Sequence, residues 1–262
     1  MASKLDRTPP LLRALSLLER IARADGPMTL RDATDGSSLP KPTVYRMLAM
    51  LEHAGLLLRD SDGRRLSPGP RLTRFALDVL LNAAARAPRH AILKALAQNV
   101  GETVNLTMLD GSDVVYLDRV ETSWPLRMTL QPGSRVPLHC TASGKLLLAS
   151  LPAARRRRLV ANLALERYTE HTLTDAKALD SELVRIRRAG FATDNEEYLA
   201  GLVCVAVPVR LKRGRAAACV AVHAPLARMP LDAAMDHLPA LHRAADAIAR
   251  TFDVPQSAST AN

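Results

Sequence analysis

Aromatic residues are scarce in this sequence, because Phe, Trp and Tyr together make up 3% of its 262 residues. Any hydrophobic core must therefore be built mainly from Leu, Val, Ala and Met. A chain of this length is long for one small domain, and it is sufficient to bury two separate cores.

Cysteine is also rare, and Cys140, Cys204 and Cys219 lie far apart without a CxxC motif. This odd, scattered set excludes the disulfide framework of a small secreted protein. The N-terminal region does not resemble a signal peptide, because Arg13 and Glu19 interrupt its apolar positions. No segment has the roughly 18 uninterrupted apolar residues that a membrane span requires. We therefore expect a cytoplasmic protein without membrane contact.

Common enzyme motifs are missing too, since the sequence contains no GxSxG, no P-loop and no Rossmann glycine pattern. A nucleophile and base could be assembled from His139, Cys140, Ser143, Lys145 and Glu197, but nothing in their spacing demands it. We expect no catalytic residues and no cofactor.

Positive charge is what the sequence has in excess, with a formal net charge of +10 at pH 7. Residues 1–75 hold 13 Lys and Arg against 8 Asp and Glu, so they carry half of this excess on less than a third of the chain. A basic surface attracts polyanions. The N-terminal quarter is therefore the better candidate for binding nucleic acid.

Three short helices are predicted in this N-terminal quarter. The first begins after Thr8 as N-cap and stops at residues 25–27, where Asp-Gly-Pro follows. The second opens at Thr29, and Asp32 completes a pattern similar to a capping box. The third spans about residues 40–53 and has a single apolar stripe.

A basic hairpin is predicted directly after these helices. Its two strands lie within residues 56–67, around the polar, glycine-bearing tip at 60–63. Arg64 and Arg65 follow the tip and can lie over a neighbouring phosphate backbone or minor groove. Three helices and a basic hairpin are the layout of a winged helix-turn-helix domain, which we place at residues 8–70.

The third helix is the predicted recognition helix, because the major groove of DNA admits one helix. Lys41, Thr43, Tyr45 and Arg46 lie off its apolar stripe and can face outward. Arg46 can contact guanine with two hydrogen bonds or simply bind phosphate. A three-helix unit that binds a protein or mediates dimerisation is the alternative for the same pattern.

The remainder of the chain predicts a helical linker at 71–87, a domain at 88–252 and a disordered tail at 253–262. Within the domain, helical and strand patterns alternate, which predicts an α+β fold with a mostly antiparallel sheet. Strand-like runs cover 104–109, 114–120, 126–130, 202–209 and 217–223. Helical runs cover 89–100, 143–150, 153–163, 175–189 and 231–252.

Four ordered segments carry a resemblance to a known family. They are LPKPTVYRMLAMLEHAG (39–55), GETVNLTMLDGSDVVYLDRVE (101–121), GSRVPLHCTASGKLLLA (133–149) and GFATDNEEYLAGLVCVAVPV (190–209). Together they resemble the IclR family of bacterial transcription regulators, over roughly residues 8–252.

This resemblance implies a winged helix-turn-helix, a helical linker and a GAF-like effector-binding domain. It also implies a homodimer, often paired into a tetramer, that binds a double-stranded DNA operator as repressor or activator of a metabolic operon. Members commonly have serine where this chain has Pro42. Proline is accepted in a first helical turn, but a hydroxyl group that could contact phosphate is lost.

The resemblance also implies an effector pocket that contains Ala142, Ser143, Gly144, Asp194 and Cys204. A physical argument supports the first three, because a helix that begins at Ser143-Gly144 directs free N–H groups at an anion. A small organic acid is the expected effector. Asp194 can accept a hydrogen bond from a hydroxyl group of that acid.

Four further positions complete the expected pocket. His139 and Thr141 flank the same turn and can add donors. Ala221 and His223 stand on the last strand, where family members often carry small hydroxyl residues. The lost hydroxyl and the added imidazole favour a different acid, larger or aromatic, with His223 pairing to its carboxylate.

Each of these residues also has a purely structural interpretation. Ser143 can be a helix cap only, Lys145 a salt-bridging residue, and Cys204 a small buried hydrophobic residue. At least one of Glu196 and Glu197 is expected to be structural, because neighbours on an extended segment face opposite sides.

Two alternatives to an effector-controlled regulator stay open at this point. A metal-responsive regulator would use His139, Cys140, Asp194, Cys204 and His223, which lack closely paired ligand spacing. An effector-independent DNA-binding protein is disfavoured by the full-length sensor-like C-terminal domain with its TASGK turn.

Overall fold

The computed structural model describes residues 9–24, 26–35, 37, 39–60, 62–122, 124, 130–211 and 216–252. Two compact units divide the chain between Leu80 and Leu81, and we call them the DNA-binding unit and the effector unit. The tail predicted at 253–262 lies outside the described residues. The boundaries of the linker at 71–87 stay a prediction.

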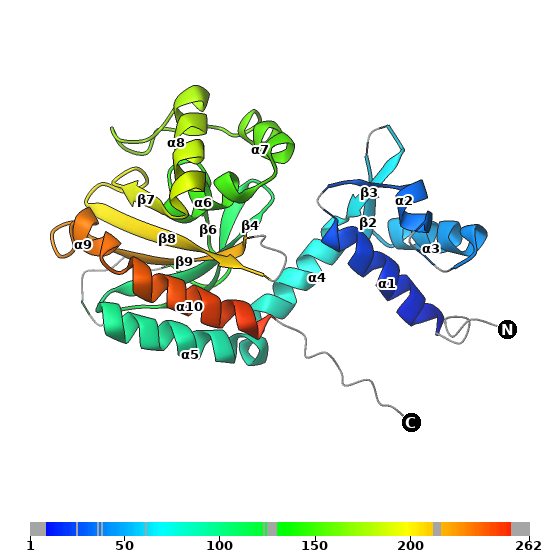
Figure 1. The fold of residues 1–262 in the computed structure, drawn as a ribbon, viewed down its shortest axis with the longest axis horizontal. Coiled ribbons are helices and arrows are strands. Elements are labelled where there is room, and N and C mark those ends of the chain that lie inside the picture. The colour runs from blue at the N-terminus through cyan, green and yellow to red at the C-terminus, as the bar shows by residue number, and fades with distance from the viewer. Residues whose placement is uncertain are drawn as a thin grey trace. The chain divides into compact units, whose positions relative to one another are not determined.

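The DNA-binding unit consists of helices and a small sheet (Figure 1). Its elements in chain order are α1 (Pro10–Arg23), β1 (Met28–Thr29), α2 (Leu30–Asp35), α3 (Lys41–His53), β2 (Leu57–Arg59), β3 (Arg65–Pro68) and α4 (Pro70–Leu81). The sheet has the antiparallel order β1-β3-β2, so the predicted hairpin forms and gains a third strand. This is a winged helix-turn-helix.

The core of this unit is aliphatic, as the shortage of aromatic residues requires. The apolar stripe of α3 is buried at Val44, Met47, Leu48 and Leu51. It packs with Leu17, Leu18, Ile21, Ala33, Leu57 and Leu66 from the neighbouring elements. Burial of these side chains determines which face of α3 is left for a partner.

Helix boundaries around the predicted linker differ from the sequence-based expectation. The sequence suggested a helical linker at 71–87 and a helix at 89–100, whereas α4 ends at Leu81 and α5 runs over Ala83–Val100 with Pro88 inside it. The side chain of Asn82 accepts the N–H of Ala84 at 3.0 Å and starts the new helix. At the N-terminus, α1 begins at Pro10 with Pro9 as its N-cap, and Thr8 lies outside the described residues.

The effector unit contains a six-stranded sheet in the order β6-β5-β4-β9-β8-β7, and every neighbouring pair is antiparallel. Its strands are β4 (Thr103–Asp110), β5 (Asp113–Val120), β6 (Arg135–Pro137), β7 (Ala192–Asn195), β8 (Leu202–Arg210) and β9 (Ala216–Pro225). The α+β class with an antiparallel sheet is confirmed, and β6 and β7 extend it beyond the predicted strands. The strand expected at 126–130 lies mostly outside the described residues.

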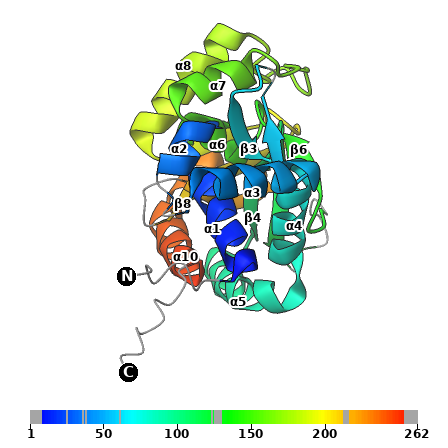
Figure 2. The same ribbon diagram turned by 90° about the vertical axis from the view of Figure 1, so that its right-hand side faces the viewer.

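Helices cover the two faces of this sheet (Figures 1 and 2). The helices besides α5 are α6 (Ala142–Ser150), α7 (Ala153–Val160), α8 (Ala176–Ala189), α9 (Leu231–Met235) and α10 (Leu238–Thr251). Both views show α5 and α10 against one face and α6, with α7 and α8 beyond it, on the other. The single helix expected at 231–252 is divided into α9 and α10. Pro239 has no N–H group, so it cannot donate the helical hydrogen bond to the carbonyl of residue 235.

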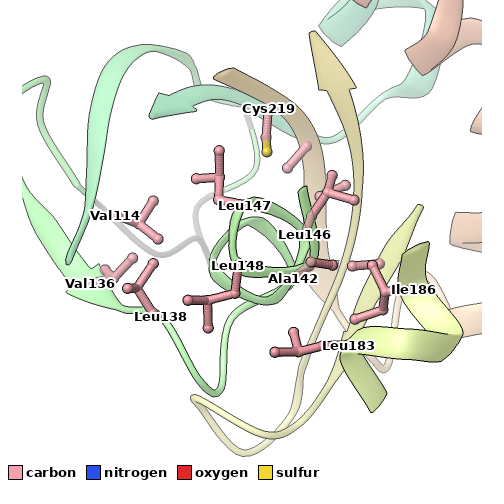
Figure 3. Packing of buried hydrophobic residues seen from close by; sticks show 14 of the residues in the cluster. Val114, Val136, Leu138, Ala142, Leu146, Leu147, Leu148, Leu183, Ile186 and Cys219 are labelled. Atoms are coloured by element: carbon pink, nitrogen blue, oxygen red, sulfur yellow. The ribbon is translucent and has the colours of Figure 1, made fainter. Parts of the chain in front are cut away.

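Helix α6 is almost fully buried, and Figure 3 shows it surrounded by apolar side chains. Leu146, Leu147 and Leu148 pack among side chains of the sheet and of α8, including Leu183 and Ile186. The helix is therefore held on all sides, and its first turn has a fixed position relative to the sheet. Among the helices of the described residues, none is long and apolar enough to cross a membrane.

Candidate functional site

The first candidate surface is the exposed side of α3 in the DNA-binding unit. Lys41, Pro42, Tyr45 and Arg46 are exposed, whereas Thr43 is half-buried. Pro42 lies in the first turn of the helix, as its missing N–H permits. Because the buried stripe packs inward, one ammonium, one guanidinium and one phenol group are available together to phosphates and base edges.

Thr29 is the predicted DNA contact that is engaged within the protein. Its hydroxyl donates to Asp32 Oδ2 at 2.6 Å and accepts the N–H of Asp32 at 3.1 Å. These bonds form the predicted cap of α2. The cap fixes the start of α2, which packs against α3. One lone pair of the Thr29 hydroxyl remains for a hydrogen bond from a partner.

Arg64 and Arg65 are exposed at the wing, and the acidic residues of its tip face the wing itself. Asp60 Oδ1 accepts the backbone N–H groups of Arg64 at 3.1 Å and Arg65 at 2.9 Å. Asp62 Oδ1 accepts the N–H of Arg64 at 2.9 Å. The hydrogen bond from Arg65 is the main reason why the pKa of Asp60 is lowered. The carboxylates thus shape the turn that presents the two arginines.

Arg59 fixes the wing to the recognition helix rather than facing a partner. Its Nε and Nη2 donate to the two carboxylate oxygens of Glu52 at 2.9 and 2.7 Å. Its Nη1 donates to the carbonyl of Gly63 at 3.0 Å. This fork-shaped contact from β2 to α3 lowers the pKa of Glu52.

The second candidate site is a cavity between the first turn of α6 and the sheet of the effector unit. Residues from β4, β5, β6, β7, β8, β9 and α6 meet there. The lining consists of Asn105, Tyr116, Val136, Thr141, Ala142, Ser143, Asp194, Tyr198, Leu202, Cys204, Ala221 and His223. The centre of a water-sized sphere can occupy about 20 Å³, little more than one water molecule needs.

Most of the predicted effector contacts meet at this cavity. Strand register explains the set, because Asp194 pairs with Cys204 and Cys204 with His223, which places the three on one face of the sheet. His139 and Gly144 do not line the cavity. The Nε2 of His139 is instead 2.8 Å from the carbonyl of Glu166.

The first turn of α6 directs hydrogen-bond donors into the cavity. Thr141 is its N-cap, and the hydroxyl accepts the N–H of Gly144 at 3.1 Å while it donates to the carbonyl of Pro137 at 2.7 Å. Ser143 is therefore not the cap. Within the described residues, no hydrogen bond uses the hydroxyl of Ser143 or the N–H groups of Ala142 and Ser143. The positive end of the helix thus faces the cavity with donors to spare.

Asp194 is the acidic group of the cavity. Its Oδ1 accepts the N–H of Glu197 at 2.8 Å and of Tyr198 at 3.4 Å. Burial and the negative charge of Glu197 raise its pKa to about 7. The carboxyl group can therefore act as an acceptor or as a proton-bearing donor near neutral pH.

Both ring nitrogens of His223 have a polar neighbour at the edge of the cavity. Its Nδ1 is 2.9 Å from Nδ2 of Asn105, and its Nε2 is 3.2 Å from Nη2 of Arg119. Burial, together with the charge of Arg119, lowers its pKa to about 3. The imidazole is neutral at pH 7 and both of its nitrogens lie within hydrogen-bond distance of Asn105 and Arg119, so an ionic pair with an effector carboxylate finds no support.

Lys145 and Glu197 form a buried ion pair behind the cavity. The ammonium group contacts Glu197 Oε1 and lies 3.8 Å from Glu182 Oε1. Lys145 is 1% exposed, and Glu197 Oε2 has no hydrogen-bond partner among the described residues. Burial raises the pKa of Glu197, and Lys145 opposes that shift. The pair joins α6 to the turn after β7.

Sequence reasoning missed Asn105, Tyr116, Val136, Tyr198 and Leu202, which also line the cavity. Asn105 carried a signal, because it is a polar residue between Val104 and Leu106 on a predicted strand. The other four are apolar or aromatic and look like ordinary core residues until the strands are placed side by side.

The cysteines are buried or half-buried thiols without disulfide bonds. Burial raises the pKa of Cys204 and raises that of Cys140 to about 12, so both stay protonated at neutral pH. In the part of the chain that the structure describes, no three His, Cys, Asp or Glu residues come together in a way that could hold a metal ion.

Comparisons with known proteins agree with both units. The model of the IclR helix-turn-helix domain matches residues 10–61, and that of the bacterial transcriptional regulator IclR C-terminal domain matches residues 78–250. The chain is 52% identical over 241 residues to the probable transcriptional regulator SauR of Cupriavidus necator, covering 92% of this chain and 96% of SauR.

Solved structures show the same architecture. The crystal structure of Thermotoga maritima IclR has a TM-score of 0.61 and 30% identity, over 92% of this chain and 97% of that one. An IclR homologue from Microbacterium hydrocarbonoxydans, solved in complex with 4-hydroxybenzoate, has a TM-score of 0.58 and 26% identity, over 93% and 98%. With a winged helix-turn-helix, a C-terminal domain built on an antiparallel sheet and both domain models matched, this chain belongs to the IclR family of DNA-binding transcription regulators.

Proposed function

We propose that this regulator changes its affinity for an operator when a small organic acid binds at the first turn of α6. The observation that carries the proposal is the set of unused donors there, the N–H groups of Ala142 and Ser143 and the hydroxyl of Ser143, which face an enclosed cavity. A helix N-terminus favours a carboxylate electrostatically and supplies its hydrogen bonds.

The size of the cavity favours a small acid. About 20 Å³ is free for the centre of a water-sized sphere, so an aromatic acid would need Tyr116, Tyr198 or Leu202 to move. A homologue binds 4-hydroxybenzoate, and an aromatic acid is therefore one arm of the test.

A homodimer is the smallest assembly that we propose. Apolar side chains on α1 and α4 are exposed in the DNA-binding unit, with Leu11 at 78% and Phe75 at 63%. Exposed apolar groups of this kind mark contact surfaces. Pairing two such units places two recognition helices on successive half-sites of DNA, and a tetramer is compatible with the same surface.

The proposed response is a shift between two geometries of this assembly. The acid binds one geometry of the effector units better, and the predicted linker at 71–87 transmits that preference to the spacing of the recognition helices. Affinity for the operator then changes without any change in base contacts. A crosslink that holds the helix spacing constant should abolish the response, and a response that persists would contradict this mechanism.

Fluorescence anisotropy tests the function directly. The full-length protein is titrated onto the DNA upstream of its own coding region and onto scrambled DNA at the same salt concentration. Acetate, succinate, benzoate and 4-hydroxybenzoate are added in turn. Tight, sequence-selective binding that one acid changes supports the proposal. Weak binding that is equal on both DNAs and insensitive to every acid contradicts it.

The serine at the helix start provides the matched variant. Ser143→Ala should weaken binding of the effective acid by about 1.5–3 kcal/mol, the contribution of a hydrogen bond to a charged group. Ser150→Ala is the control, because this hydroxyl lies at the other end of α6 and donates to the carbonyl of Leu146. Equal effects of the two variants would argue against binding at the first turn.

A further inference from the structure

Asp194 is a buried acidic residue of the cavity, and the described residues give it no salt-bridge partner. It is 3% exposed. Two backbone N–H groups, from Glu197 and Tyr198, reach Oδ1. Neutral side chains face it from β8 and β5, where Cys204 lies opposite in register and Tyr116 shares the cavity.

Charges of both signs lie near Asp194, and the negative charge of Glu197 affects its pKa more strongly than the positive charge of Lys145. Lys145 on α6 is the nearby cation, and it already contacts Glu197 and Glu182 of α8. Glu182 also pairs with Arg185, so Asp194 and Glu197 would share the ammonium group of Lys145 within a buried region. On the far side of the cavity His223 is neutral, and Arg119 behind it pairs with Glu121.

An organic acid that enters the cavity as an anion adds one more negative charge beside the buried carboxylates of Asp194 and Glu197. The donors of α6 can hold one end of its carboxylate, but an ionised Asp194 would repel the acid and offer it only acceptor atoms. A protonated Asp194 removes one negative charge and donates a hydrogen bond to the acid. Protonation is therefore favoured by the same event that fills the cavity.

We propose that the effector acid binds together with one proton, which resides on Asp194, so that the affinity of this regulator for its effector depends on pH. The inference rests on the proposed function, because it concerns the same cavity. In this proposal, the anion binds well only when Asp194 carries a proton.

The direction of the pH dependence follows from linkage. The pKa of Asp194 is raised to about 7 in the free protein by burial and by Glu197, and a bound anion raises that pKa further. Below this pKa the carboxyl is already protonated, so affinity is constant. Above it, affinity falls by about tenfold for each pH unit, until the pKa of the complex is reached.

The first measurement concerns the free, full-length protein. Carboxyl ¹³C NMR follows the titration of Asp194 between pH 4 and 9, and Asp194→Asn assigns the resonance. We expect a midpoint near 7, as the raised pKa implies. A midpoint in the ordinary range of a carboxylate, roughly 4, would overturn the proposal whatever the effector is.

The second measurement is calorimetric binding of acetate, with acetamide as its uncharged analogue, from pH 5.5 to 8.5. Acetate affinity should fall by about tenfold per pH unit above 7, with uptake of about one proton in buffers of different ionisation enthalpy. Acetamide affinity should not fall. Asp194→Asn should bind acetate without pH dependence, because an amide always presents a donor.

Glu170→Gln is the control variant, since it makes the same carboxylate-to-amide change at a side chain that is 88% exposed. It should keep the pH dependence of the wild-type protein. Acetate binding with constant affinity and no proton uptake would overturn the coupling and leave the proposed function intact. Failure of both acetate and 4-hydroxybenzoate to bind at any pH would overturn both proposals.

Discussion

Gly144 shows how one residue can look like a ligand contact and serve the packing of the site. A Cβ atom at this position would lie 2.3 Å from the carbonyl oxygen of Leu138 and 2.5 Å from its Cα. The first turn of α6 thus approaches the preceding chain segment so closely that only glycine fits. This approach holds the donors of Ala142 and Ser143 at the cavity.

Gly144→Ala should therefore destabilise the effector unit. The clash involves backbone atoms, which cannot rotate away, and over-packing of this kind costs about 1–3 kcal/mol. Thermal unfolding followed by circular dichroism measures the loss. Gly26→Ala is the control, because nothing lies within 4 Å of an added Cβ there. A Gly144→Ala protein as stable as the control would refute the close-approach argument.

Lys145 is the other residue whose role the contacts define. Among the fully buried side chains of the described residues it has one of the largest volumes, and its ammonium group joins α6 to Glu197 and to Glu182. A buried cation of this kind stabilises only together with its partners, because each ion alone would be desolvated without compensation.

Lys145→Met should lower the free energy of unfolding by about 3–5 kcal/mol at neutral pH, as the loss of one partner leaves buried carboxylates unpaired. The loss should be smaller at pH 5 than at pH 8. The pKa of Glu197 is already raised by burial, and loss of the cation raises it further, so acid neutralises the unpaired group. Urea unfolding at the two pH values gives both numbers.

Arg185→Met is the control, because it removes an exposed cation that pairs with Glu182. Arg185 pairs with Glu182 at 2.6 Å but is 51% exposed, so its removal should cost less than about 1 kcal/mol. Equal losses for the two variants, or a Lys145→Met deficit that does not change with pH, would argue against the buried-pair interpretation.

At the scale of elements, α3 and the wing act as one surface. The contact between Arg59 and Glu52 joins them, while Asp60 and Asp62 hold the turn that carries Arg64 and Arg65. The two acidic side chains of the wing tip are thus directed at the backbone N–H groups of the wing.

Arg46→Ala should weaken specific DNA binding by about 1–3 kcal/mol and relax the preference at one base position, if its exposed guanidinium reads a base edge. Anisotropy titrations on operator and scrambled DNA separate the possibilities, because a loss of equal size on both means contact with phosphate alone. Arg158→Ala removes the same charge from the exposed face of α7 and should leave binding unchanged.

At the scale of the whole molecule, the exposed apolar residues of α1 and α4 are the strongest indication of assembly. Leu11, Leu12 and Leu15 on α1 and Phe75 and Val79 on α4 are all at least 46% exposed. These five side chains are not part of the hydrophobic core of the DNA-binding unit, so the packing of that core does not explain their position.

Leu15→Glu combined with Phe75→Glu should shift the protein towards monomer, because two buried charges per chain oppose the contact. Sedimentation equilibrium measures the change. Met50→Glu is the control, since Met50 is also 65% exposed but lies on the recognition helix. It should keep the assembly and weaken DNA binding. A double variant that sediments like the wild-type protein would exclude this surface as the interface.

Local patterns were sufficient for most of the architecture. The α3 stripe, the capping pair of Thr29 and Asp32, the glycine-bearing wing and the alternation of strands are signals between residues a few positions apart. Such signals predict the same helix or strand wherever one face of that element is buried. Boundaries were less predictable, as the break at Asn82 shows, because a side-chain cap competes with continuation of the helix.

The amino-acid sequence by itself determined the two units, the outward face of the recognition helix, and through its motifs the family and most of the cavity. Only the tertiary structure decided what each cavity residue can do. It placed Asn105 beside His223, kept that imidazole neutral next to Arg119, and buried Asp194 with Glu197 close by. The physical reason is that protonation and hydrogen bonding depend on burial and, at His223, on neighbours over a hundred positions away, which no local pattern contains.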